Sequence, residues 1–183
     1  MDEQVAIEAV TNMLVSCATA LFAEYGLSIG EPVGPGDQQT TSLPGETLGG
    51  IVGYTGDRIR GSVSVLTLPS VLSRTLPSSV HPDERAFCDW IGELANMLLG
   101  RLKNRLLRTG LSLEMAVPVS ARGTGLTVSI SPGTVWRCHT FHTAAGPIVV
   151  RFDAVFDAGF VFAFDGGAQA EGGYMTEGEC LLF

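Results

Sequence analysis

The sequence predicts an α+β fold in which two long helices pack on a mainly antiparallel β-sheet. Apolar side chains recur at helical spacing in two long segments, one near the N-terminus and one after residue 80. The remaining apolar residues form short runs rich in Val, Ile, Thr and Phe that are separated by turn residues. Long helices combined with such a meander are typical of an α+β layer fold. The 183 residues, 45% of them hydrophobic, suffice for one domain with a substantial core.

Residues 3–26 are predicted to form the first helix. Its apolar stripe consists of Val5, Ala9, Met13, Cys17 and Leu21. Gly26 is a suitable helix stop, and the prolines and glycines of residues 26–46 favour a loop. Residues 48–56 and 61–68 then predict a β-hairpin that turns at Asp57-Arg58. Residues 69–77 predict a short helix or a turn.

A second long helix is predicted within residues 81–110, because Pro82 and acidic residues precede it and basic residues and Gly110 follow it. Five later runs predict further strands: 111–123, 126–131, 134–142, 147–156 and 159–164. Residues 1–164 are therefore assigned to one domain. Residues 165–183 form a tail whose first half is glycine-rich and linker-like.

The second long helix carries a polar line on the side opposite its core face. At about 100° per residue, the core face comprises Phe87, Ile91, Leu94, Leu98 and Leu102. The polar line comprises Asp89, Glu93, Asn96, Gly100 and Lys103. Trp90 and Met97 flank the line on one side and Leu99 on the other, so these three are predicted to contact a partner.

A solvated helix face is the alternative explanation of the polar line, and it accounts well for Lys103 at the helix end. It accounts poorly for Asn96 and Gly100, because both residue types cost about 0.5 to 1 kcal/mol in a helix interior relative to alanine. Gly100 would leave room for another backbone. A carboxamide such as that of Asn96 can hold a water in line with a phosphorus atom, and the Glu93 carboxylate can pair with a lysine. Placement of a water is a large part of phosphoryl-transfer catalysis.

The segment "DWIGELANMLLG" followed by Pro118 resembles the signature of the CheX, CheC and FliY family of chemotaxis phosphatases. That signature contains an acid or serine, then glutamate, asparagine and a later proline, which match Asp89, Glu93, Asn96 and Pro118. The segments "GIVGYTGDRIRGSVSVL" and "GLSLEMAVPVSARG" resemble the CheX branch in order and spacing. The resemblance covers about residues 3–162.

The resemblance implies a phosphatase that hydrolyses the aspartyl phosphate of a CheY-like response-regulator receiver. Glu93 would pair with the active-site lysine of the receiver, and Asn96 would hold the attacking water. Asp89, Gly100 and Pro118 would support the motif. The receiver would bind Mg²⁺, so no cofactor or metal ligand is expected in this chain.

The resemblance also implies a homodimer joined through sheet edges and a role in two-component signalling. Two other classes of function stay open: a non-catalytic receiver-binding or scaffold domain of the same fold, and a structural component of the flagellar switch. "AVTNMLVS" from Ala9 echoes "ELANMLLG" from Glu93, which indicates either a pseudo-two-fold repeat or a chance likeness of two helices. Ala9 stands where the second helix has Glu93, so a second active site beside Asn12 is not expected.

Composition argues against several other classes. The net charge of −8 and the single lysine disfavour nucleic-acid binding. The acidic N-terminus is unlike a signal peptide, and no apolar run is judged to approach the roughly 20 residues of a membrane span. A cytoplasmic location is therefore expected. The four cysteines lack paired spacing, which favours reduced thiols. Cys138, His139 and His142 make a poor zinc site, because a strand turns His139 to the opposite side.

Overall fold

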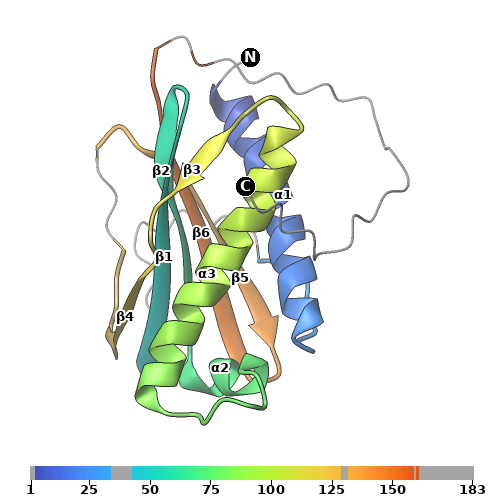
Figure 1. Cartoon of the computed structure of the whole chain (residues 1–183), viewed down its shortest axis with the longest axis vertical. Helices are drawn as coiled ribbons and strands as arrows, with labels where there is room; N and C mark the ends of the chain where they lie inside the picture. The colour runs from blue at the N-terminus through green and yellow to red at the C-terminus, as the bar shows by residue number, and fades with distance from the viewer. Residues whose placement is uncertain (1–2, 34–42, 129–131, 159, 161–183) are drawn as a thin grey trace, which may run out of the picture.

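A computed structural model describes residues 3–33, 43–128, 132–158 and 160. The chain runs from helix α1 (Glu3–Glu24) through the hairpin of β1 (Glu46–Gly56) and β2 (Ile59–Thr67) to the short helix α2 (Pro69–Thr75). It continues through the long helix α3 (Glu84–Leu107), the short strands β3 (Leu113–Met115) and β4 (Val119–Thr124), and the hairpin of β5 (Val135–Thr143) and β6 (Gly146–Phe156). Figure 1 shows α3 and α1 lying along the sheet, with α2 at one end of it.

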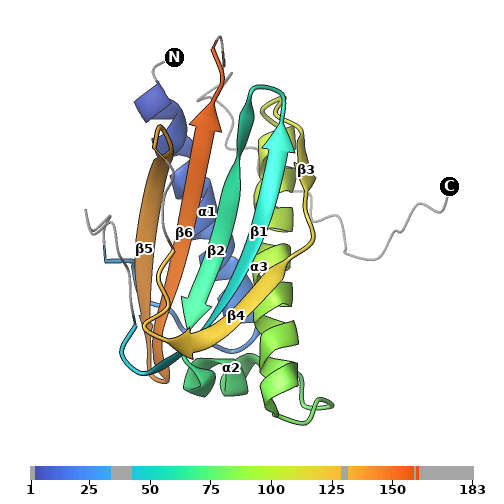
Figure 2. The same ribbon diagram turned by 90° about the vertical axis from the view of Figure 1, so that its left-hand side faces the viewer.

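The six strands form one antiparallel sheet, as the sequence predicts. The strand order is β3-β1-β2-β6-β5, and β4 also pairs with β1. Figure 2 shows both long helices behind the sheet, so that they cover the same face. The predicted α+β architecture is confirmed, and the domain has two layers.

The hairpins form where turn residues interrupt the apolar runs. In the first hairpin the register pairs Gly56 with Ile59, and Arg58 adopts a positive φ of 59°. Such a φ suits the tight two-residue turn predicted at Asp57-Arg58. The predicted single strand over residues 111–123 is instead divided into two. β3 pairs with the end of β1, and β4 pairs with its beginning. Between them the register shifts by one residue, because Met115 lies opposite Tyr54 and Val119 lies opposite Ile51.

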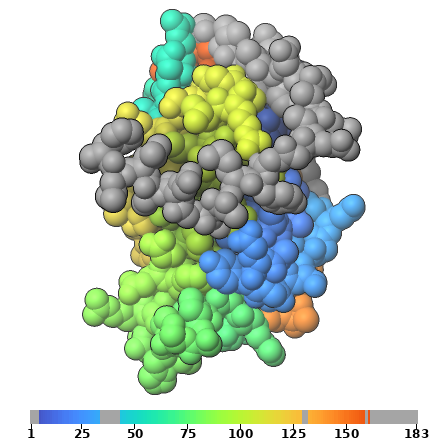
Figure 3. All heavy atoms as spheres, turned by 45° about the vertical axis from the view of Figure 1, so that its right-hand side comes forward, coloured from blue at the N-terminus to red at the C-terminus, as the bar shows by residue number. Residues whose placement is uncertain are grey.

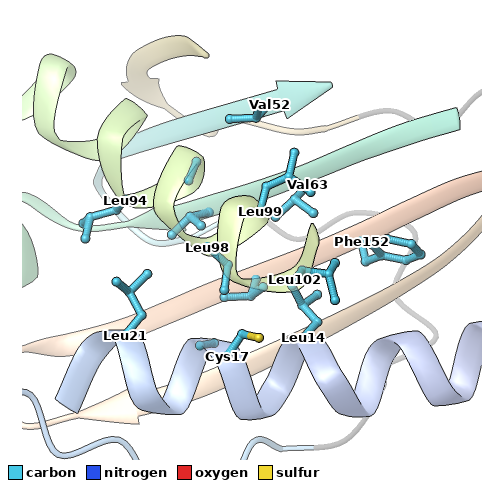
Figure 4. Packing of buried hydrophobic residues seen from close by; sticks show 14 of the residues in the cluster. Leu14, Cys17, Leu21, Val52, Val63, Leu94, Leu98, Leu99, Leu102 and Phe152 are labelled. Carbon is cyan, nitrogen blue, oxygen red and sulfur yellow. The ribbon is translucent and has the colours of Figure 1, made fainter. Parts of the chain in front are cut away.

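The core lies between the helices and the inner face of the sheet. Figure 4 shows Leu14, Cys17 and Leu21 of α1 facing Leu98 and Leu102 of α3, with the strands beneath them. All five of these side chains are fully buried. The buried thiol of Cys17 has a raised pKa because burial disfavours the thiolate. Among the described residues, Cys17 and Cys88 are free thiols, as predicted.

The apolar character of α1 exceeds what the sequence analysis expected. Val5–Glu24 is long and apolar enough, by length and composition, to cross a membrane. The statement that no segment approaches the length of a span is therefore wrong. In the structure half of this window is buried against the rest of the protein, which is the environment of a core helix in a globular domain.

Helix α3 lies very close to β1 because β1 has a glycine at the point of contact. A Cβ atom added at Gly50 would lie 2.3 Å from the Ile91 carbonyl oxygen and 3.1 Å from the Ala95 Cβ. At the start of the helix the Asp83 carboxylate accepts a hydrogen bond of 2.7 Å from the Ala86 N–H, which is an N-cap. Both features hold the first half of α3, where the predicted site lies.

Parts of the predicted organisation lie outside the described residues or stay untested. The predicted strand 126–131 is not a strand at residues 126–128, and residues 129–131 lie outside the described part. The predicted strand 159–164, apart from residue 160, and the tail 165–183 with Cys180 also lie outside it. The pseudo-two-fold repeat remains a prediction.

Candidate functional site

The polar line of α3 lies on the surface of the helix layer. Glu93 is exposed, and Asn96 and Gly100 are half-buried. The Asp89 side chain is 75% exposed and lies 3.8 Å from the Arg85 guanidinium, an ion pair between two solvated side chains. Among the described residues, none would lie within 4 Å of a Cβ atom added at Gly100. Within the described part of the chain, these four residues therefore share one open face, with free space at Gly100.

Within the described part of the chain, neither the Glu93 carboxylate nor the Asn96 carboxamide has a hydrogen-bond or ion-pair partner. They lie on adjacent turns of one helix, three residues apart. Other polar side chains on this side of the molecule do have partners: Arg101, for example, forms a two-pronged ion pair with Glu24 of α1. The hydrogen-bonding capacity of Glu93 and Asn96 is thus available to another molecule.

Trp90 and Met97 form one shoulder of the polar line, as predicted, and both are half-buried. The Trp90 indole N–H donates a hydrogen bond of 2.9 Å to Thr75 Oγ1 of α2. The Tyr25 ring meets the Trp90 ring edge to face, at a centroid distance of 5.2 Å, and the Tyr25 hydroxyl lies 3.5 Å from the Met97 sulfur. These contacts fix the shoulder in place, whereas most exposed side chains are free to rotate. Its role in partner binding stays a prediction.

The prediction that Leu99 lies on the opposite shoulder is wrong. Its side chain is fully buried, and Figure 4 shows it among the core residues beside Val63. Leu99 lies about 80° around the helix from Ile91. Because α3 packs against α1 on one side and against the sheet on another, its buried sector is wider than the single stripe that periodicity suggested. Leu99 therefore stabilises the core and cannot contact a partner.

Pro118 forms the second shoulder in place of Leu99. A Cβ atom added at Gly92 would lie 3.7 Å from the Pro118 Cβ and 2.9 Å from Ser120 Oγ. The Ser120 hydroxyl donates a hydrogen bond of 2.6 Å to the Cys88 carbonyl oxygen. On either side of Pro118, Val117 and Val119 are 83% and 64% exposed. The second shoulder is thus a short apolar ridge held against α3.

The sequence analysis missed Gly92, Ser120 and the two valines. The signal for Gly92 was present, because a glycine in a helix interior requires a packing reason. For Ser120 there was no signal, since its partner is a backbone carbonyl 32 residues away. The valines were assigned to a strand, and the register against β1 shifts by one residue between Met115, opposite Tyr54, and Val119, opposite Ile51.

Charged residues tie β4 to the start of α3. The Arg122 guanidinium lies 2.8 Å from a Glu46 carboxylate oxygen of β1 and 2.9 Å from one of Glu84 on α3. The hydrogen bond to Glu46, followed by the charges of both carboxylates, raises the pKa of Arg122. The cluster contributes to the position of the ridge beside the polar line, although exposed ion pairs of this kind contribute little to stability.

The described residues contain no group of three or more His, Cys, Asp or Glu side chains placed to hold a metal ion. Cys138 and His139 lie on opposite faces of β5, and His139 is buried. What the polar line offers is a carboxylate that can pair with a cation and a carboxamide that can both donate to and accept from one water.

Solved structures place the fold in the class of CheC-like and CheX chemotaxis proteins. The chemotaxis protein CheX from Desulfovibrio desulfuricans has a TM-score of 0.67 and 22% identity, and the match covers 79% of this chain and 97% of that one. A chemotactic CheC-like protein from Shewanella oneidensis has a TM-score of 0.63 and 22% identity, with coverage of 81% and 96%. CheX in a CheX–CheY–BeF3–Mg²⁺ complex from Borrelia burgdorferi has a TM-score of 0.58 and 17% identity, with coverage of 79% and 97%.

The sequence identifies the family within this class. The family model "Chemotaxis phosphatase CheX" matches residues 48–138, a range that includes Asp89, Glu93, Asn96, Gly100 and Pro118. A search of curated proteins gave no match. The chain belongs to the CheX family, as the motif predicted.

Proposed function

We propose that this protein is a phosphatase that hydrolyses the aspartyl phosphate of a CheY-like response-regulator receiver. The observation that carries the proposal is the pair Glu93 and Asn96, which lies on an open helix face without partners in the described part of the chain. The family model supports it, and so does the solved complex of a CheX with CheY and Mg²⁺ in Borrelia burgdorferi.

The roles of the two residues follow from their chemistry. Glu93 pairs with a lysine of the receiver, which fixes the register of α3 on its surface. Asn96 then enters the phosphorylation site and holds a water in line with the phosphorus, donating to it through the amide and accepting through the carbonyl oxygen. The space at Gly100 admits the receiver backbone. The receiver supplies Mg²⁺, which would neutralise charge on the phosphoryl oxygens.

The test is the decay of a receiver from the same organism, phosphorylated with acetyl phosphate, in the presence and absence of the protein. We expect wild type to accelerate decay, and Asn96→Ala to lower that acceleration by about 100-fold or more, because misplacement of a reacting group costs on this order. Asn12→Ala is the matched control, since Asn12 is an exposed asparagine of α1. It should retain the activity of wild type.

Other outcomes would contradict the proposal. If Asn96→Ala accelerates decay as well as wild type does, Asn96 does not hold the water. If wild type binds the phosphorylated receiver but leaves its decay unchanged, the protein is a receiver-binding scaffold of the same fold. Stable co-purification with flagellar-switch proteins, again without an effect on decay, would indicate a structural role in the switch.

We also propose that the protein acts in the cytoplasm as a homodimer joined through sheet edges. Along the outer edge of β5, the described residues show a single isolated bridge, between Val33 and Thr140. The remaining backbone groups of that edge can pair with a second chain. Sedimentation equilibrium tests this state, and a monomer at micromolar concentration would contradict it.

A further inference from the structure

A hollow lies directly beside Glu93, between the N-terminal half of α3 and the segment that connects it to α2. It has a volume of about 430 Å³, within the range of ligand pockets. Leu76, Val80 and Trp90 supply its apolar lining. Figure 3 shows the green surface of α2 and the start of α3 at this end of the molecule. The motif residues of the family do not explain why a hollow should be there.

The walls of the hollow are preformed. The Val80 N–H donates to the Pro77 carbonyl oxygen at 2.9 Å, which closes a turn in the connecting segment. Trp90 is held by its hydrogen bond to Thr75, and the Thr75 hydroxyl in turn donates to the Leu72 carbonyl oxygen at 3.1 Å. Val80 is nevertheless 40% exposed. A rigid apolar surface that is open to solvent lowers the entropy cost of binding a side chain.

The rim of the hollow is acidic. Its lining contains three acidic residues, Asp83, Asp89 and Glu93, and two basic ones, Arg85 and His81. Asp83 uses one carboxylate oxygen for the helix cap. Arg85 is 91% exposed and lies 3.8 Å from Asp89, too far for a hydrogen bond. An exposed ion pair of this geometry is weak, so another cation can replace Arg85 beside Asp89.

We propose that this hollow takes a long basic side chain, lysine or arginine, from the surface of the phosphorylated receiver. This side chain is distinct from the lysine that pairs with Glu93, and the inference rests on the proposed function. Its aliphatic stem lies on Val80, Leu76 and Trp90, as the stems of such side chains often cover apolar surface, and its charged end lies beside Asp89. Asp89 thereby contributes to the choice of receiver. The polar line then holds both a residue for receiver specificity, Asp89, and a residue for hydrolysis, Asn96.

The experiment measures the affinity of the full-length protein for a CheY-type receiver of the same organism, activated with beryllofluoride and Mg²⁺. Val80→Lys places a positive charge in the hollow, and we expect it to weaken binding by at least tenfold. Val5→Lys is the matched control, because Val5 is 50% exposed on α1, and it should bind as wild type does. Circular dichroism checks that both variants fold.

Two further variants test whether the side chain that occupies the hollow is positively charged. Asp89→Asn should weaken binding about fivefold and reduce its dependence on salt, because one attractive charge is lost. Arg85→Ala should tighten binding, because the competing cation is gone. In steady-state assays, Asp89→Asn should raise KM and leave kcat close to that of wild type.

The outcomes separate this inference from the proposed function. If Asn96→Ala abolishes hydrolysis while Val80→Lys and Asp89→Asn bind the receiver as wild type does, the hollow is not a receiver contact. Tighter binding of both Val80→Lys and Asp89→Asn would overturn the basic occupant in favour of an acidic one. If Val80→Lys alters the sedimentation of the protein but not its receiver affinity, a second copy of the chain occupies the hollow. Failure of wild type to bind any receiver would overturn both proposals.

Discussion

At the scale of single residues, His139 is placed where a charge is costly. It is 8% exposed on β5, and neither ring nitrogen has a hydrogen-bond partner among the residues that the structure describes. Burial, and then the positive charge of Arg137, lower its pKa from the usual value for histidine. The folded protein therefore holds this imidazole neutral, whereas the unfolded chain can protonate it freely.

This environment predicts a pH dependence of stability. Because the folded pKa lies below the unfolded value, the unfolded state binds more protons as the pH falls through about 6.5. Above about pH 7.5 the protonation of His139 should thus have no effect on the free energy of unfolding. Below pH 6.5 it should make the free energy of unfolding decline. His139→Phe should reduce that decline in urea titrations at pH 5.5, 6.5 and 7.5.

The control for this prediction is His142→Phe, because His142 is exposed on the same strand. Its pH dependence should match that of wild type. An unchanged slope in His139→Phe would show that the neutral form of His139 is not favoured by folding.

Asn96 and Leu99, three residues apart on α3, show how far sequence can place single residues. Helical periodicity placed Asn96 on the outer face correctly, because a residue opposite the apolar stripe has no core to enter. Periodicity alone cannot give the width of the buried sector. That width depends on how many elements pack against the helix. Leu99 is buried because α3 packs against the sheet as well as against α1, and helical periodicity does not reveal these contacts.

At the scale of elements, α3 and the segment from Pro118 to Ser120 are fitted together at Gly92. A methyl group at this position would lie 2.9 Å from Ser120 Oγ. The hydroxyl can rotate away, but it then loses its hydrogen bond to the Cys88 carbonyl oxygen. The net value of such a bond is about 1 kcal/mol, while alanine favours the helix over glycine by about 1 kcal/mol.

These two effects predict a specific coupling. Gly92→Ala should change the free energy of unfolding of wild type by less than about 0.5 kcal/mol, since the hydrogen bond lost offsets the helix propensity gained. In a Ser120→Ala background the same change should stabilise the protein by about 1 kcal/mol, because there is no hydrogen bond left to lose. Urea denaturation of the four proteins measures both values.

Equal effects of Gly92→Ala in both backgrounds would contradict the coupling. They would indicate that Ser120 does not restrain the position of β4 beside the helix.

The boundaries of α1, α3 and both hairpins were close to predictable, because each depends on neighbouring residues: a glycine or aspartate at an end, or a two-residue turn. The division between β3 and β4 was not. The division is a one-residue shift of register against β1, a partner more than 55 residues earlier. The contacts that hold Trp90 could not be predicted from the sequence either, because Tyr25, just after α1, and Thr75 of α2 are distant from it in the chain.

At the scale of the whole molecule, the two long helices share one face of the sheet, so each depends on the other for burial. Half of the α1 window that would suit a membrane span is buried, and its Leu14, Cys17 and Leu21 face α3 and the strands (Figure 4). The buried apolar face of α1 is therefore part of the domain core.

Truncation of a single α1 side chain tests this interdependence. Leu14 is fully buried, and Leu14→Ala should lower the free energy of unfolding by about 2 to 5 kcal/mol through lost burial and a residual cavity. Ser16→Ala, at an exposed position of α1, should change it by less than about 0.5 kcal/mol. A loss below about 1 kcal/mol for Leu14→Ala would mean that α1 is not packed as described.

The absence of a side chain at Gly50 governs how far the proposed catalytic pair projects. Glu93 and Asn96 belong to the same turns of α3 as Ile91 and Ala95, which rest on this glycine from the other side. Any larger residue at position 50 would lift those turns off the sheet and move the tips of both side chains outward. The depth to which the carboxamide enters a receiver is thus set from beneath the helix, by a residue that no partner can touch.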